Sequence, residues 1–386
     1  MSSSKEEIEY RIKNFQQKIK SQKLEAVLVF SPLNIFYFTN TFVKGVLLIS
    51  NKETKLFVHR PLERAKKESF IPCEYLPHLK SLSEYLKKLN IFNIGIECKS
   101  FDIEGFNKIK KIFDNISIKC IDNLILEERM IKTPYEINCV IEAGKRLNQA
   151  LRKALPQFKP GMKEIEASAI IEKELRLRGH PGWIRSFWGF EIPYGYLISG
   201  KEALEPVHFI TGEGGKGICG FPGGATNKKI KKKDPILIDF SGYFKGYYID
   251  QTRMASFEKI PEAEEFYQIA LKILKTLEKE TKPGIRAEEI YERSLYIVQK
   301  NGFKKYFMNH GGGVKFIGHG VGLQIDEPPT IAQDQKIELK ENMIIALEPK
   351  FHVPDLGVIG LEDTYLITKN GLKRLTKTPR KWILLK

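Results

Sequence analysis

Residues Ile236 to Met254, ILIDFSGYFKGYYIDQTRM, predict two strands joined by a tight turn. Ile236 to Ile238 is an apolar run typical of a buried strand, and Tyr247 to Arg253 alternates between two faces. Between these runs, Lys245-Gly246 can supply the positive φ angles of a two-residue hairpin turn. The sequence therefore predicts an antiparallel hairpin with a fixed register.

In that register Asp239 faces Thr252, and Asp250 lies on the same face as Asp239, one diagonal step away. Two carboxylates on one face repel each other and are costly to bury, and a shared cation would remove that cost. Asp250 could instead form an ordinary salt bridge with Arg253 or a nearby lysine. The hairpin alone leaves the metal site and the salt bridge equally open.

The length and composition indicate an ordinary globular protein of two domains. The chain has 386 residues, of which 42% are hydrophobic and 28% charged. The net charge of +16 comes mostly from scattered lysines, and the densest run, residues 228–233, is not interleaved with aromatic side chains or arginines. This run predicts a solvated surface, with a polyanion site as the minor alternative. No apolar run approaches the length needed to cross a bilayer, so we expect neither a nucleic-acid partner nor a membrane.

The cysteines and the amino-terminal segment predict a cytoplasmic protein. The five cysteines are widely spaced and form no CxxC pair, which favours reduced thiols over a disulfide framework. They are Cys73, Cys98, Cys120, Cys139 and Cys219. The segment MSSSKEEIEYRIK carries charge where a signal peptide would need an apolar region.

The chain divides by pattern into two predicted domains, residues 1–127 and 128–386. In the first, β-type segments alternate with helical ones, as in an α/β domain. The expected strands are 26–30, 46–50, 55–59 and 94–98, and the expected helices include 5–21 and 81–89. The second domain opens at Thr133-Pro134-Tyr135-Glu136, where Thr133 and Glu136 can form a capping box for a helix that runs to about Leu155.

An internal repeat organises the second domain. Lys159-Pro160-Gly161 starts a helical segment that ends at Gly179, and Lys282-Pro283-Gly284 starts another of equal length that ends at Gly302. Pro-Gly is a common turn signal, so a chance recurrence is the alternative. The equal lengths favour duplication into halves of 130–257 and 258–386.

The second half carries a counterpart of the first hairpin. Met343 to Glu348 is an apolar run that ends in an acid, and Gly357 to Thr368 is a second strand that carries Glu362. Along the chain between the two hairpins, His319 lies in a glycine-rich stretch whose glycines let the backbone approach closely. Four carboxylates and one imidazole form an oxygen-rich ligand set for two divalent ions.

These motifs resemble the prolidase, aminopeptidase P, methionine aminopeptidase and creatinase superfamily of Xaa-Pro peptidases. The resemblance covers nearly the whole chain. It rests on RMIKTPYEI (129–137), DFSGYFKGYYIDQTR (239–253), GHGVGLQIDEPP (318–329), ALEP (346–349) and GLEDT (360–364). It implies an α/β amino-terminal domain of the creatinase type and an α+β pita-bread catalytic domain with an internal pseudo-two-fold repeat.

The resemblance also implies roles for the five ligand positions. Asp239 would bind one metal ion, and His319 and Glu348 the other, while Asp250 and Glu362 would bridge the two. Glu348 would also accept the proton of the attacking water. The two divalent ions would be manganese, cobalt, zinc or iron, and a homodimer is expected by analogy.

Three positions depart from the family's pattern. Asp326 stands where family peptidases carry a histidine. His208 lies one place later than the family's upstream histidine, since Val207 follows Pro206, and Gly360 stands where proline-specific members have an arginine. In a strand, a shift by one would turn His208 to the other face unless a bulge restored it. We keep Asp326 and His208 as candidate catalytic residues beside Glu348.

These features lead to one leading hypothesis and two alternatives. The leading one is metal-dependent hydrolysis of a peptide bond near the amino terminus of a short peptide. The altered positions favour a second hypothesis, a creatinase-like enzyme that acts on a small non-peptide substrate. A binding protein that kept the fold without the chemistry is the third.

Two further segments bear on substrate binding. The glycine-rich region 211–226 predicts a flexible loop, with a lid at the mouth of the site as one interpretation. The aromatic-rich segment 183–196 either lines a substrate pocket or packs in the core.

Overall fold

The computed structural model describes residues 4–309 and 313–386. The chain divides into two compact units, Met1–Arg129 and Met130–Lys386. The boundary expected from the sequence lies two residues earlier. Within the described residues no helix is long and apolar enough to span a membrane.

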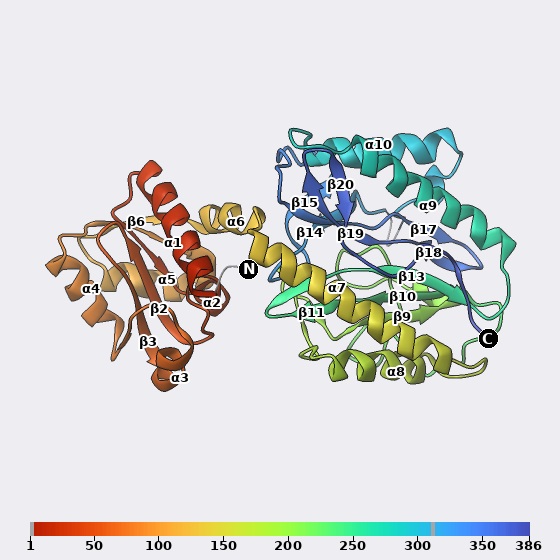
Figure 1. The fold of residues 1–386 in the computed structure, drawn as a ribbon, viewed down its shortest axis with the longest axis horizontal. Helices are drawn as coiled ribbons and strands as arrows, with labels where there is room; N and C mark the ends of the chain where they lie inside the picture. The colour runs from red at the N-terminus through yellow and green to blue at the C-terminus, as the bar shows by residue number, and fades with distance from the viewer. Residues whose placement is uncertain (1–3, 310–312) are drawn as a thin grey trace. The chain divides into compact units, whose positions relative to one another are not determined.

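The amino-terminal unit is a six-stranded sheet with helices packed against it (Figure 1). Its strands, in spatial order, are β4 (Cys73–Tyr75), β3 (Thr54–Arg60), β2 (Lys44–Ser50), β1 (Ala26–Val29), β5 (Asn93–Ile96) and β6 (Ser117–Cys120). Its helices are α1 (Ser4–Ser21), α2 (Pro32–Thr39), α3 (Leu62–Glu68), α4 (Leu79–Lys88), α5 (Ile103–Ile112) and α6 (Asp122–Met130). β1 pairs antiparallel with β2 and parallel with β5.

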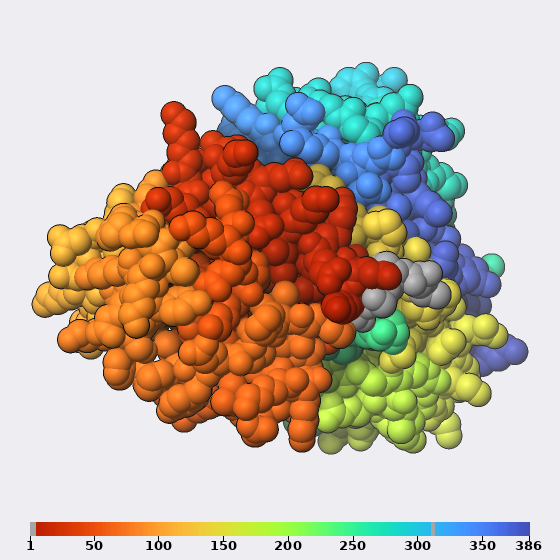
Figure 2. Space-filling model, turned by 60° about the vertical axis from the view of Figure 1, so that its left-hand side comes forward, coloured from red at the N-terminus to blue at the C-terminus, as the bar shows by residue number. Residues whose placement is uncertain are grey.

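Alternating apolar residues explain why this sheet is stable. Leu28 and Leu48 from the central strands are fully buried against Leu86 of α4 and Ile109 of α5. Burial of such side chains is the main favourable contribution to folding. In the space-filling view the elements of this unit, coloured red to orange, pack into a continuous body (Figure 2). The α/β character expected for this part of the chain is confirmed.

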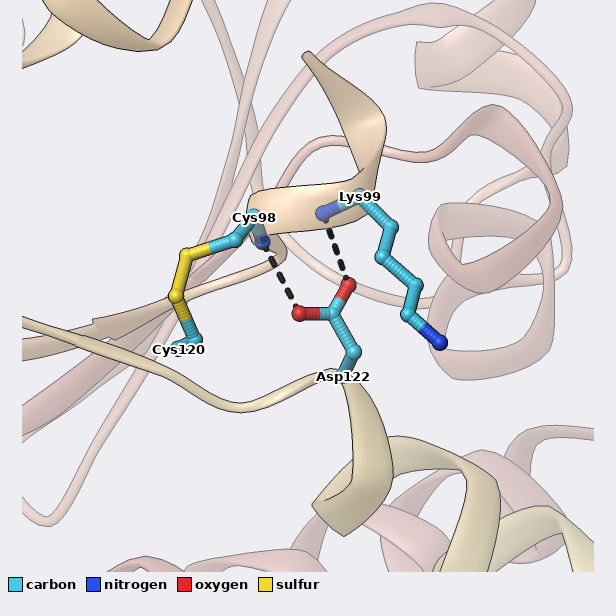
Figure 3. The surroundings of a disulfide bond; sticks show 4 residues. All are labelled: Cys98, Lys99, Cys120 and Asp122. Atoms are coloured by element: carbon cyan, nitrogen blue, oxygen red, sulfur yellow. Dashed lines mark hydrogen bonds between the residues drawn. A yellow bond between two sulfur atoms is a disulfide. The ribbon is translucent and has the colours of Figure 1, made fainter. Parts of the chain in front are cut away.

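The expectation of reduced cysteines is wrong for one pair, because Cys98 and Cys120 form a disulfide (Figure 3). β5 and β6 run parallel with Ile96 opposite Cys120, so the chain just past β5 brings the Cα of Cys98 within 5.3 Å of that of Cys120. The carboxylate of Asp122 accepts the backbone N–H groups of Cys98 and Lys99 at 3.1 and 3.0 Å and holds this turn. Spacing along the sequence could not show the pair, since it depends on the register of two separate strands.

In the carboxy-terminal unit the predicted repeat is confirmed. Helix α7 (Pro134–Ala154) begins with the expected capping box and is followed by α8 (Glu164–Leu177). Helix α9 (Pro261–Glu280) is followed by α10 (Ala287–Lys300), and α8 and α10 each have 14 residues. Each KPG turn places its glycine at positive φ, 82° and 98°, a conformation that glycine adopts without strain.

Strands from both halves lie between these helices. In Figure 1, α9 and α10 lie above the strands and α8 lies below them, while α7 crosses in front. The first-half strands are β7 (Ile184–Arg185), β8 (Glu191–Ile192), β9 (Gly195–Ser199), β10 (Ile236–Phe240), β11 (Gly242–Phe244), β12 (Tyr247–Ile249) and β13 (Thr252–Ser256). The second-half strands are β14 (Phe316–Gly320), β15 (Glu327–Ala332), β16 (Ile344–Leu347), β17 (Lys350–Val353), β18 (Gly357–Gly360), β19 (Asp363–Thr368), β20 (Gly371–Arg374) and β21 (Ile383–Leu384).

The hairpin predicted at residues 236–254 forms in the expected register. Asp239 is paired with Thr252 between β10 and β13, and the turn at Lys245 and Gly246 has φ angles of 47° and 96°. The ribbon is nevertheless interrupted: β10–β13 and β11–β12 belong to separate sheets, with Asp250 in the link between β12 and β13. The link frees Asp250 from strand pairing.

The second half repeats this arrangement. β16 pairs antiparallel with β19, and the β17–β18 hairpin extends from their ends. Leu347 is paired with Asp363. Glu348 directly follows Leu347 and Glu362 directly precedes Asp363, so the two acids lie next to the same strand pair. The interruption again leaves two acids at neighbouring strand ends, which is the geometry that a shared cation requires.

Candidate metal centre

All five residues expected as metal ligands line one cavity of about 480 Å³. Each comes from a different part of the interrupted sheets. Asp239 lies in β10, Asp250 in the β12–β13 link, His319 in β14, Glu348 between β16 and β17, and Glu362 between β18 and β19. The duplicated halves thus contribute to a single site.

Three of these residues are close enough to share one ion. Asp250, His319 and Glu362 each offer a ligand atom, and these atoms all lie within 4.8 Å of one another. The Nε2 atom of His319 lies 4.0 Å from Asp250 Oδ2 and 4.0 Å from Glu362 Oε1. It lies 3.4 Å from Glu348 Oε1, so Glu348 borders the same space.

A threonine hydroxyl joins the two halves of the ligand set. Thr252 Oγ1 lies 2.8 Å from Asp239 Oδ2 and 2.8 Å from Glu362 Oε2. A hydroxyl carries a single hydrogen, so it cannot donate to both carboxylates at once. The hydroxyl can donate to only one of these two carboxyl groups. The other carboxyl group must therefore be protonated and donate its own hydrogen to the hydroxyl oxygen.

The electrostatics of the cluster agree with this proton. Burial, followed by repulsion from Asp239, raises the pKa of Asp250 to about 7. Burial and the charge of Asp250 raise the pKa of Glu362 well above its ordinary value. Buried like charges favour the neutral form, and protons here take the place of positive charge. The carboxylates would give up these protons to a cation.

Two members of the cluster are charged instead. Burial alone would raise the pKa of Glu348, but the charge of Lys350 and the hydrogen bond with His319 outweigh it and lower the pKa to about 2. Burial alone would lower the pKa of His319, but the hydrogen bond and charge of Glu348 raise it to about 9. Glu348 and His319 therefore form an ion pair.

The residues present fit a divalent metal ion. The Oε1 atom of Glu362 is buried and has no hydrogen-bond partner among the described residues, which is costly unless a ligand satisfies it. The donors around it are carboxylate oxygens and an imidazole nitrogen. This donor set suits manganese, iron, cobalt and zinc.

Comparison with known proteins assigns the chain to a family. A model of metallopeptidase family M24 matches residues 138–369, and one of the creatinase/prolidase N-terminal domain matches residues 11–131. The chain is 31% identical to the Xaa-Pro dipeptidase of Pyrococcus horikoshii over 378 residues, which cover 97% of this chain and 98% of that one. The chain belongs to metallopeptidase family M24.

Solved structures of M24 relatives share the fold of the whole chain. The prolidase from Pyrococcus horikoshii OT3 aligns with a TM-score of 0.81 and 29% identity over 97% of this chain and 100% of that one. The Xaa-Pro dipeptidase from Bacillus anthracis aligns with a TM-score of 0.83 and 25% identity over 97% and 99%. The creatinase-type amino-terminal domain and the pita-bread catalytic domain expected from the sequence are confirmed.

Of the two further catalytic candidates, only Asp326 lines the cavity. Asp326 lines the cavity, but its carboxylate accepts the hydroxyl of Ser186 at 2.6 Å and the backbone N–H of Phe187 at 2.5 Å. It therefore holds the wall of the pocket. His208 is exposed and does not line the cavity, although its neighbours Phe209 and Ile210 do.

The pocket walls are largely apolar. The aromatic segment resolves into both of its expected roles: Trp188, Phe190 and Tyr196 line the cavity, whereas Tyr194 stacks on buried His180 with ring centroids 4.9 Å apart. Ile210, from the neighbouring irregular segment, adds to the wall. Apolar walls with a few convergent polar groups are typical of small-ligand sites.

Two residues of the site were not found by sequence reasoning, Lys350 and Glu213. The Nζ atom of Lys350 donates to Asp239 Oδ2 at 3.1 Å and to Glu348 Oε2 at 2.8 Å, and it also contacts Glu213 Oε2. A weak signal for Lys350 existed, since it follows Glu348 by two residues and period two would place both side chains on one face of an extended chain. Glu213 gave no signal beyond being a single acid in the glycine-rich loop.

A buried ion pair contacts the backbone of Glu362. Arg253 donates to the backbone carbonyl of Glu362 at 2.6 Å and to Asp363 Oδ1 at 2.6 Å. The side chains of Arg253 and Asp363 are both fully buried. This pair fixes the backbone on which Glu362 is carried.

Proposed function

We propose that this chain is a metal-dependent peptidase that hydrolyses the bond before proline in short peptides. The observation that carries the proposal is the convergence of Asp239, Asp250, His319, Glu348 and Glu362 around one apolar-walled cavity. The similarity to an Xaa-Pro dipeptidase over the full chain supports the substrate class. A cavity of about 480 Å³ suits a ligand of dipeptide size.

The five residues would hold the divalent metal ions, and a bound ion would polarise the substrate carbonyl and activate water. The family resemblance makes Glu348 the proton acceptor, and its carboxylate is ionised, with its pKa lowered to about 2 by Lys350 and His319. The aromatic wall formed by Trp188, Phe190 and Tyr196 would bind the substrate's apolar groups and exclude water.

Further details of the proposal come from the family resemblance. The resemblance implies two divalent ions, and manganese is the first metal to test. The proposed reaction itself needs only one bound ion. We also propose a cytoplasmic homodimer. Size-exclusion chromatography with light scattering tests the dimer, and metal analysis of the purified chain tests the ions.

Hydrolysis of a dipeptide panel tests the function. With manganese or cobalt added, the chain is expected to cleave Xaa-Pro dipeptides in preference to matched Xaa-Ala dipeptides. A chelator should stop the reaction, and added metal should restore it. Failure to cleave any peptide under these conditions would contradict the proposal.

One observation favours a second function. Asp326, at the position of a family histidine, is bound to Ser186 and Phe187, and His208 is exposed. The groups expected to grip a peptide are therefore altered, as a creatinase-like enzyme with a small non-peptide substrate would allow. Metal-dependent hydrolysis of non-peptide amides without peptide cleavage would support this second function. Metal-free, inactive protein would favour a binding protein.

Metal binding is expected to release protons and to strengthen as the pH rises to about 9. The pKa of Asp250 is raised to about 7 and that of His319 to about 9. Asp250 therefore carries a proton below about pH 7, and His319 carries one below about pH 9, and an ion must displace both. Calorimetric titration in two buffers with different ionisation enthalpies measures the protons released. Affinity that does not change with pH would contradict this electrostatic description.

A further inference from the structure

We propose that the ammonium group of Lys350 occupies one of the two cation positions of this centre, so that each chain binds a single divalent ion. The ion would lie between Asp250, His319 and Glu362, and Lys350 would neutralise Asp239 on the other side. This inference rests on the proposed function, because it assumes a metal-dependent hydrolase.

The hydrogen bonds of Lys350 are satisfied inside the site. Its side chain is 1% exposed, and its Nζ atom contacts the carboxylates of Asp239, Glu348 and Glu213. An ammonium group has three hydrogens to donate, and three carboxylates surround it. The ammonium group is therefore a fixed part of the centre.

The aliphatic part of the Lys350 side chain packs closely against two glycines. Lys350 is paired with Gly360 across the β17–β18 hairpin, and a Cβ on Gly360 would lie 2.5 Å from Lys350 Cγ. On the other side, a Cβ on Gly212 would lie 2.7 Å from Lys350 Cδ. Larger residues at either position would displace the lysine, so both glycines are matched to it.

The ammonium lies where a second ion would need Asp239. Asp239 Oδ2 already accepts Lys350 at 3.1 Å and lies 2.8 Å from Thr252 Oγ1. A divalent ion bound to Asp239 would sit about 2.0 to 2.6 Å from its oxygens and therefore close to the ammonium. Repulsion between two buried positive charges at such a distance is strong.

The other position is clear of the lysine. Among the described residues, Lys350 makes no hydrogen bond to Asp250, His319 or Glu362, whose ligand atoms lie within 4.8 Å of one another. Glu348 stands between the two positions: its Oε1 faces His319 at 3.4 Å and its Oε2 faces Lys350 at 2.8 Å. One exchangeable ion and one fixed ammonium would thus share Glu348.

The number of ions bound per chain tests the inference. Metal-stripped protein is titrated with Mn²⁺, and bound metal is measured by mass spectrometry after gel filtration and by electron paramagnetic resonance. The wild-type chain is expected to bind one ion and to show an isolated Mn²⁺ spectrum. The variant Lys350→Gly is expected to bind two ions with an exchange-coupled spectrum. Lys201→Met, which removes an exposed lysine paired with Asp355, is the control and should bind one.

Each outcome decides between the possibilities. Two ions in the wild-type chain would overturn the inference and leave the proposed function standing. One ion in both the wild type and Lys350→Gly would also overturn it, because the lysine would not be the reason. No bound ion in any of the proteins would overturn the metal-dependent function as well. If Lys350→Gly does not fold, the count and spectrum of the wild-type chain decide alone.

Discussion

Glu362→Gln is expected to lower kcat/KM on an Xaa-Pro dipeptide by about a thousandfold or more, which corresponds to a loss of ~4 kcal/mol of transition-state stabilisation. Glu362 belongs to the group of three residues whose ligand atoms lie within 4.8 Å of one another. Its Oε1 atom is buried without a hydrogen-bond partner among the described residues. An amide in this place has the same shape but removes the negative charge that the ion requires.

The amide can keep the contact with Thr252, so the fold should survive the change. Thermal unfolding of the ion-free variant checks this point, and metal content and steady-state kinetics measure the effect. Glu338→Gln, at an exposed glutamate of the same unit, is the matched control and should retain full activity. A Glu362→Gln variant that keeps more than about a tenth of the activity would rule out the assigned role.

Arg253→Met is expected to destabilise the catalytic unit by about 3 kcal/mol or more. Arg253 is fully buried, and its guanidinium donates to Asp363 Oδ1 and to the carbonyls of Glu362 and Thr378. Removing it takes a charged partner from the buried carboxylate of Asp363 and a donor from the carbonyls of Glu362 and Thr378, among others. Activity should fall together with stability, because the carbonyl of Glu362 loses its donor.

A second arginine near the same carboxylate is the matched control. Arg374 lies 3.9 Å from Asp363 Oδ2 and is one-third exposed. Arg374 is partly solvated and at 3.9 Å is too far from this carboxylate for a hydrogen bond, so Arg374→Met should change stability little. Denaturant unfolding followed by circular dichroism measures both variants. Equal effects of the two changes would contradict the importance of burial for Arg253.

The sequence predicted features that depend on local patterns. The hairpin register follows from the turn at Lys245-Gly246, and the pairing of Asp239 with Thr252 follows from that register. The equal helices after the two KPG turns follow from hydrophobic periodicity and glycine stops. Local signals of this kind do not require knowledge of distant segments.

Features that depend on distant segments were missed. The contact between Lys350 and Glu213 joins residues 137 positions apart, and no pattern in either segment predicts it. The disulfide of Cys98 with Cys120 depends on how β5 and β6 align. His208 was considered as part of a strand, but the chain there is irregular and exposes it.

The most direct test of the account is anomalous diffraction from crystals of the wild-type chain grown with Mn²⁺. The account predicts an anomalous peak within bonding distance of Asp250, His319 and Glu362, at the position where their ligand atoms converge. Crystals that contain manganese only elsewhere, with these three side chains bound to one another or to solvent, would contradict it.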